Sequence, residues 1–164
     1  MNIDRINIKL NKKMKIKNIL KLIVSLGATL SAGVIGSFFT VSSVSVWYTT
    51  LNKPALNPPA WVFGPVWTLL YILMGISLFL IWQKHSHILE NVRMLQVWEI
   101  GIVVFLAQLF LNIIWSILFF GLENPGLALV DIIFLWLAIL CTVFLFYKIS
   151  RSAAYLLLPY LLWV

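Results

Sequence analysis

The sequence predicts an all-α integral membrane protein folded as a bundle of five transmembrane helices. Of its 164 residues, 62% are hydrophobic and 10% are charged, whereas soluble domains carry about 25% charged residues. Three stretches contain no charged residue at all: 22–52, 54–83 and 100–122. Each is longer than the roughly 20 apolar residues that cross a bilayer core, so each predicts a membrane crossing.

Two further apolar runs complete the expected bundle. Residues 126–147 contain a single charge, Asp131, and residues 152–164 contain none. We therefore expect one membrane domain, residues 19–164, behind a basic N-terminal tail, residues 1–18. The five helices are expected at about 19–46, 60–83, 97–121, 126–148 and 151–164.

The positive charge is confined to one side of the predicted bundle. The net charge is +7, and eleven of the twelve Lys and Arg residues precede residue 22 or fall in the segments 83–97 and 147–152. Five crossings place these three regions on one side and leave only Lys53 on the other. Because segments rich in Lys and Arg stay in the cytoplasm, we expect a cytoplasmic N-terminus. The expected location is that of a multi-pass protein in a bacterial cell membrane. The basic tail is expected to meet lipid headgroups rather than nucleic acid.

The first helix, 19–46, carries small residues at four-residue spacing: Ala28, Ala32, Gly36 and Thr40. Such a face lets helices approach closely in lipid, where van der Waals packing drives association. It fits packing within the bundle or a homodimer interface, and the sequence leaves both open. The apolar run continues well beyond Ala32, so we expect an uncleaved helix rather than a signal peptide.

The segment that follows, WYTTLNKPALNPPAWVFGPVW, is rigid and aromatic. Pro54, Pro58 and Pro59 each remove a backbone donor and disfavour a helical residue before them. With Trp47 at its start, the segment is too apolar for a solvated linker. We expect residues 47–60 to form a lid over a pocket in the bundle.

The second helix, 60–83, places Trp67 and Tyr71 on one face, because residues four apart are neighbours on a helix. This face begins at the mouth of the lid segment and runs down into the bilayer. This face is therefore the first expected wall of the pocket.

The third helix, 97–121, carries a polar and aromatic stripe made of Gln108, Asn112, Trp115 and Phe119, at spacings of four, three and four. Two carboxamides in a membrane helix are costly unless they meet partners or a ligand. They predict either hydrogen bonds between helices or polar contacts in a largely apolar cavity. The spacing does not decide between these two.

The last two helices add a carboxylate and an irregularity. Asp131 lies about six residues, or roughly 9 Å, inside its helix, and an intramembrane carboxylate is a candidate functional residue. It could join a polar network with Gln108 or Asn112, or bind a cationic group of a ligand. A helix from Arg151 to the last residue would span about 21 Å, less than the roughly 30 Å of hydrocarbon. The fifth helix is therefore expected to be truncated.

No nucleophile–base pair, paired carboxylates or phosphate-binding glycine loop is visible, so no catalytic residue is assigned. His85 and His87 lack a third ligand and Cys141 is the single cysteine, so we expect no metal site and no required cofactor. Aromatic rings and a few amides near one membrane face instead suit a flat, apolar ligand with polar edges, such as a porphyrin, a sterol or a heteroaromatic compound.

Four motifs occur in an order that resembles one known family. They are WYxxLxKPxxxPPxWxFGPVWxxLY, QLxLNxxWSxxFF, NPGLALVDI and LLPYLLW, and together they resemble the tryptophan-rich sensory protein/translocator protein family over residues 20–164. The resemblance implies a five-helix bundle, commonly homodimeric, that binds protoporphyrin IX and related flat ligands beneath the loop between its first two helices. The binding residues it implies are Tyr48, Trp67, Tyr71, Gln108, Asn112, Trp115, Asp131 and Trp163.

The expected function is thus that of a membrane receptor, carrier or sensor with a porphyrin as ligand. The resemblance also implies two alternatives. Some bacterial relatives are associated with light-dependent porphyrin degradation, which would involve Trp67 and Trp163 here, with an indole donating an electron to the photo-excited porphyrin. A sterol or small-molecule transporter is the second alternative, since residues 145–151 fit the loose sterol-binding pattern.

Overall fold

The computed structural model describes the backbone of residues 3–53 and 57–164, and side chains from residue 14 onward within these ranges. The described residues form helices joined by short connections, and none of them forms a strand. Pro54, one of the expected lid prolines, lies outside the described residues. The elements in order are α1 (Ile3–Val44), α2 (Trp47–Thr50), α3 (Ala60–Ile88), α4 (Val92–Ser116), the π-helical segment η1 (Ile117–Gly121), α5 (Pro125–Ile149) and α6 (Arg151–Trp163).

Four helices are long and apolar enough to cross a membrane, which confirms the membrane class and four of the five expected crossings. They are Met14–Val44, Ala60–Ile88, Val92–Gly121 and Pro125–Ile149. The fifth crossing is not established, because α6 has 13 residues and a helix of that length spans about 20 Å. The number of crossings supported by the fold is therefore four.

Helix α1 begins much earlier than residue 19, where the sequence suggested a boundary. It starts at Ile3 and runs for 42 residues, so the basic segment is helical and continuous with the membrane helix. The segment contains no Pro or Gly before Gly27, and Lys, Leu, Met and Ile all tolerate helix well. Charge marks where a helix leaves the bilayer, but it does not end the helix.

The polar segment expected as a loop at 83–97 is also mostly helical. Helix α3 continues to Ile88 and α4 starts at Val92, which leaves only a short turn. Asn91 provides the start signal for α4, because its side chain accepts a hydrogen bond from the backbone N–H of Met94 at 3.1 Å. Asn124 does the same for α5, accepting from Leu127 at 3.0 Å.

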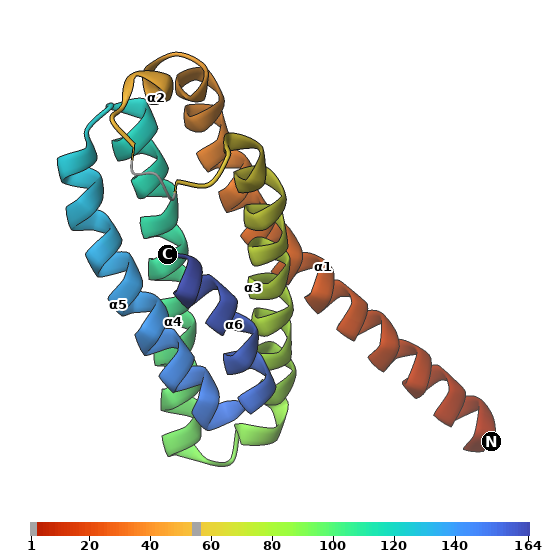
Figure 1. Cartoon of the computed structure of the whole chain (residues 1–164). Helices are drawn as coiled ribbons and strands as arrows, with labels where there is room; N and C mark the ends of the chain where they lie inside the picture. The colour runs from red at the N-terminus through yellow and green to blue at the C-terminus, as the bar shows by residue number, and fades with distance from the viewer. Residues whose placement is uncertain (1–2, 54–56) are drawn as a thin grey trace.

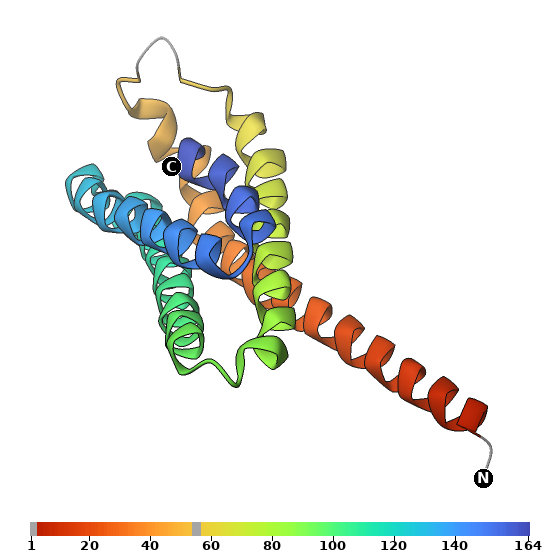
Figure 2. The same ribbon diagram turned by 90° about the horizontal axis from the view of Figure 1, so that it is seen from below.

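Helix α6 occupies the middle of one face of the bundle. It packs against both α3 and α5, while α1 packs against α3 and α4. Figures 1 and 2 show α6 returning from the end of α5 and lying between α3 and α5, and the N-terminal part of α1 extending beyond the bundle. The segment with α2 and the loop after it lies at the opposite end from the α3–α4 turn.

The small residues of α1 are used within the bundle. Ser25, Thr29, Ala32 and Gly36 are all buried, and they follow each other at helical spacing. A Cβ added to Gly33 would lie 2.5 Å from the ring of Tyr71 on α3. The packing interpretation of the small-residue face is thus supported by these contacts, and the homodimer stays a prediction.

We expect Gly33→Ala to lower the free energy of unfolding by about 1–3 kcal/mol, the usual cost of overpacking, because the added Cβ would meet the ring of Tyr71, whose hydroxyl is bonded to Asn112. Gly27→Ala is the matched control, since a Cβ there meets nothing within 4 Å. Denaturation in detergent, followed by tryptophan fluorescence, measures both. Equal stability of the two variants would contradict the close α1–α3 contact.

Candidate functional site

A cavity of about 270 Å³ lies in the bundle beneath the lid segment. Its wall comes from the lid, from α3, α4 and α5, and from the end of α6, so residues far apart in the sequence line it. The lining residues are Pro58, Phe63, Trp67, Asn112, Trp115, Ile132, Leu135, Trp163 and Val164.

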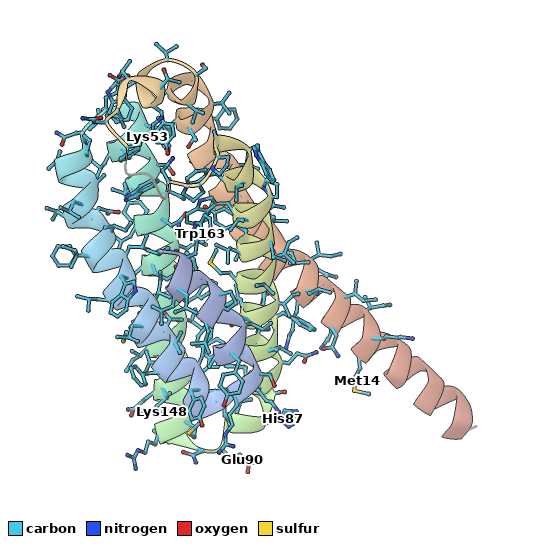
Figure 3. The ribbon with its side chains drawn as sticks, in the orientation of Figure 1. Met14, Lys53, His87, Glu90, Lys148 and Trp163 are labelled. Atoms are coloured by element: carbon cyan, nitrogen blue, oxygen red, sulfur yellow. The ribbon has the colours of Figure 1, made fainter. Side chains whose placement is uncertain are left out.

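Four of the eight residues expected to bind a ligand line this cavity: Trp67, Asn112, Trp115 and Trp163. Figure 3 shows Trp163 at the end of α6, pointing into the upper half of the bundle below the lid. The ring of Trp163 meets Phe63 of α3 edge to face, with centroids 6.1 Å apart. The wall is therefore largely aromatic, with one carboxamide.

The carboxamide of Asn112 is held by two tyrosines from different helices. The hydroxyl of Tyr71 on α3 donates to Asn112 Oδ1, and Asn112 Nδ2 donates to the hydroxyl of Tyr160 on α6 at 3.0 Å. The indole of Trp67 packs against both tyrosine rings, at 5.6 Å from Tyr71 and 6.1 Å from Tyr160. Of the two roles left open for this amide, Asn112 fills the interhelical one and also faces the cavity.

Tyr160 is a site residue that the sequence did not single out. It is fully buried, and its place in the LLPYLLW motif, three residues before Trp163, puts the two side chains on one face of a helix. That spacing is the signal that could have identified it. Tyr71 does not line the cavity, but it contacts two residues that do: it donates a hydrogen bond to Asn112 and packs against Trp67.

Gln108 and Asp131 are buried but do not line the cavity. Gln108 Nε2 lies 4.0 Å from Met74 Sδ, a weak contact, and its Oε1 atom has no hydrogen-bond partner among the described residues. Asp131 is 7% exposed, one turn before Leu135 on α5, and its Oδ2 atom likewise has no described partner. Of the two possibilities left open for Asp131, the network with Gln108 or Asn112 is not formed by direct hydrogen bonds among the described residues.

Tyr48 belongs to the lid rather than to the cavity wall. Its hydroxyl donates to Asn57 Oδ1 at 3.1 Å, and its backbone carbonyl accepts from Lys53 Nζ at 2.7 Å. The ammonium group of Lys53 also lies 4.2 Å from the centre of the Tyr48 ring, a cation–π contact. Pro58 reaches the cavity, whereas Pro59 is exposed.

An aromatic cluster connects the lid to the cavity. Phe119 stacks on Trp115 with centroids 5.0 Å apart and an interplanar angle of 9°. The same ring meets Trp47 at 5.3 Å and Tyr48 at 6.4 Å. Trp115 faces the cavity, so Phe119 lies between a lining residue and the lid.

The π-helical segment η1 positions this cluster. One extra residue per turn lets Leu122 N–H bond to the carbonyl of Ile117 at 2.8 Å, and such segments often mark functional sites. Ser43 of α1 donates to the carbonyl of Phe120 at 2.6 Å. Helix α1 therefore holds η1 in place from outside the cavity.

Apolar and aromatic side chains make up most of the cavity wall, together with the carboxamide of Asn112. The residues that line it include no nucleophile, carboxylate or histidine, and its one polar side chain is already hydrogen-bonded twice. Within the described ranges, no group of three His, Cys, Asp or Glu side chains could hold a metal ion. Apolar and aromatic walls with few polar groups are typical of sites for small organic ligands.

The family model and the relatives that match this chain all point to one protein family. A sequence model of the TspO/MBR family matches residues 25–164. The chain is 48% identical over 147 residues to "Tryptophan-rich protein TspO" of Archaeoglobus fulgidus, with 90% of each chain covered. It is 43% identical over 152 residues to the protein of the same name from Chlorobaculum tepidum, covering 90% of this chain and 89% of the relative. The human "Translocator protein" is 37% identical over 130 residues, which cover 79% of this chain and 73% of the relative.

The two amides of α4 are expected to respond differently to apolar replacement. Asn112→Leu leaves the hydroxyls of Tyr71 and Tyr160 without their partner, which costs about 1–3 kcal/mol of stability. Gln108→Met keeps the side-chain volume and removes a group that bonds weakly, so stability stays within about 1.5 kcal/mol. Equilibrium unfolding in mixed detergent micelles compares them. A loss for Gln108→Met as large as that for Asn112→Leu would refute this assignment.

Proposed function

The chain belongs to the TspO/MBR family, and from that premise we propose that it is a membrane receptor or carrier for porphyrins of the protoporphyrin IX type. The ligand would occupy the cavity beneath the lid. The observation that carries the proposal is the meeting of three tryptophans, Trp67, Trp115 and Trp163, around one cavity that contains a single polar side chain, Asn112.

The shape and chemistry of the wall favour a flat aromatic ligand. Indole rings offer large rigid faces that stack on another π-system, and they stand on three different helices. Asn112 keeps one acceptor position on Oδ1 and one N–H on Nδ2 for a ligand, because each of these atoms has a single tyrosine partner. A ligand that is apolar across its plane and polar at its edge fits this distribution.

The lid would have to move to admit a macrocycle. The cavity of about 270 Å³ lies just below the roughly 300–1,000 Å³ of typical ligand sites. The hydrogen bonds of Tyr48 and Lys53 are internal to the lid, whereas its link to the bundle includes ring contacts with Phe119. Opening of the lid would thus separate Trp47 and Tyr48 from Phe119, while the hydrogen bonds within the lid stay formed.

We also propose that α6 is the fifth membrane segment and that the N-terminus lies in the cytoplasm. Helix α6 packs between two membrane helices, and Lys and Arg are concentrated at the end of the bundle where α6 begins. Reporter fusions to the N-terminus and to the lid test this orientation, and an extracellular N-terminus would overturn it.

Titration of the detergent-solubilised protein with protoporphyrin IX is expected to quench tryptophan fluorescence saturably. Trp67→Ala removes a wall of the cavity and should weaken binding at least about tenfold, or about 1.4 kcal/mol. The control is Trp61→Ala, since Trp61 is 76% exposed and does not line the cavity. Binding that survives in both Trp67→Ala and Asn112→Ala would place the ligand elsewhere.

Light-dependent degradation of the porphyrin is a second candidate function, favoured by one observation. Trp67 and Trp163 line the same cavity, so a bound macrocycle would lie within reach of two oxidisable indoles. Illumination of the complex in air should then yield a defined product, and Trp67→Phe and Trp163→Phe should each abolish it. Bleaching at the wild-type rate in both variants would contradict the degradation function, and only the receptor function would remain.

A further inference from the structure

The turn between α5 and α6 is basic and aromatic, and it lies at the end of the bundle opposite the lid (Figure 3). The guanidinium of Arg151 lies 5.6 Å from the centre of the Tyr147 ring. Tyr147 meets Tyr155 of α6 edge to face at 6.1 Å. Lys148 and Arg151 are exposed, and so are the two tyrosines, at 43% and 55%.

Local structure holds these groups together. Helix α5 ends at Ile149, and Ser150 adopts an extended conformation with φ −153° and ψ 110°. The Ser150 side chain accepts a hydrogen bond from the N–H of Ala153 and starts α6 directly. The reversal takes one residue, so Lys148 and Arg151 project from the ends of two adjoining helices.

The charge of the turn has no carboxylate of its own to balance it. No Asp or Glu follows Asp131 in the sequence, and Asp131 lies near the other end of α5. The neighbouring α3–α4 region carries Glu90 and Glu99, but also Lys84 and Arg93. This end of the bundle therefore keeps a net positive charge, to which Lys148 and Arg151 contribute.

The surface beside the turn is apolar. Phe144 on α5 is 64% exposed and Leu158 on α6 is 37% exposed, and both helices continue into the membrane domain. Tyrosine rings at such a border occupy the level between headgroups and acyl chains. The turn thus presents cations at headgroup level with an apolar surface below them.

We propose that the α5–α6 turn binds the phosphate group of an anionic glycerophospholipid. Arg151 offers a planar fork of donors that matches phosphate oxygens, and Lys148 adds a second cation. The acyl chains would lie on the apolar surface around Phe144 and Leu158. This site is independent of the cavity and of the porphyrin proposal.

The test is retention of lipid by the full-length protein in mild detergent, counted by native mass spectrometry. The probes are dioleoylphosphatidylglycerol, which is anionic, and dioleoylphosphatidylcholine, which is zwitterionic. The wild-type protein is expected to retain the anionic lipid preferentially. One basic side chain near an anionic lipid surface strengthens binding about fivefold, so Lys148→Gln with Arg151→Gln should weaken retention about 25-fold.

Two further variants separate a site from general attraction. Lys53→Gln removes one positive charge at the lid end and should leave retention unchanged. Arg151→Lys keeps the charge but lacks the planar fork of donors. Its retention of the anionic lipid should weaken by no more than about fivefold. Unchanged retention in the double variant, an equal loss in Lys53→Gln, or equal retention of the two lipids would overturn the proposal.

Two additional measurements keep the result interpretable. The double variant should match the wild type in thermal unfolding and in protoporphyrin IX titration, because the turn is remote from the cavity. If the double variant unfolds at a lower temperature, Arg151→Gln alone replaces it. That single variant should still retain the anionic lipid about fivefold less tightly than the wild type. Residues 145–151 also fit a loose sterol pattern, so cholesterol is added as a competitor. Displacement of the anionic lipid by cholesterol at equal concentration would make the turn a sterol site and overturn the proposal.

Discussion

The half of the bundle nearer the lid depends on the two hydrogen bonds of the Asn112 side-chain amide. A carboxamide inside a membrane has no water to bond, so its atoms must find partners in the protein. Asn112 finds them on two other helices, Tyr71 on α3 and Tyr160 on α6. These bonds fix the two tyrosine rings against which Trp67 packs. One polar group thus sets the positions of aromatic residues from two helices besides its own.

The small residues of α1 make this arrangement possible. Tyr71 can reach Asn112 only if its ring lies where α1 would otherwise place a side chain, and Gly33 leaves that space free. Membrane helices associate through close packing, since lipid tails are as apolar as the side chains they replace. The same principle explains the burial of Ser25, Thr29 and Ala32 on α1. The hydrogen bond between Tyr71 and Asn112 therefore depends on the small residues of α1, which let α1 and α3 pack closely.

The sequence was sufficient for features set by the hydrocarbon thickness and by helical spacing, such as the four long crossings and the shared face of Trp67 and Tyr71. It was insufficient where a residue's role depends on its partner. Gln108 and Asn112 look equivalent in the sequence, yet only Asn112 has two good partners. Tyr160 was missed because its role depends on the folded bundle bringing its hydroxyl to Asn112 of α4, and the spacing to Trp163 is the one sign of it in the sequence. The helical start at Ile3 was missed because charge was taken as a boundary, although Lys-rich segments form helices readily.

The two ends of the bundle differ in what they can bind, and the reason is the distribution of charge along the chain. Among the described residues at the lid end, Lys53 is the one cation, and its ammonium group is already bonded to the Tyr48 carbonyl. Aromatic rings dominate there, and the stack of Trp115 on Phe119 joins the cavity wall to the lid. A ligand that displaced Trp115 would therefore disturb the ring contacts that hold the lid. One pair of stacked rings therefore joins the cavity wall to the lid, and η1 sets the position of that pair with the help of Ser43.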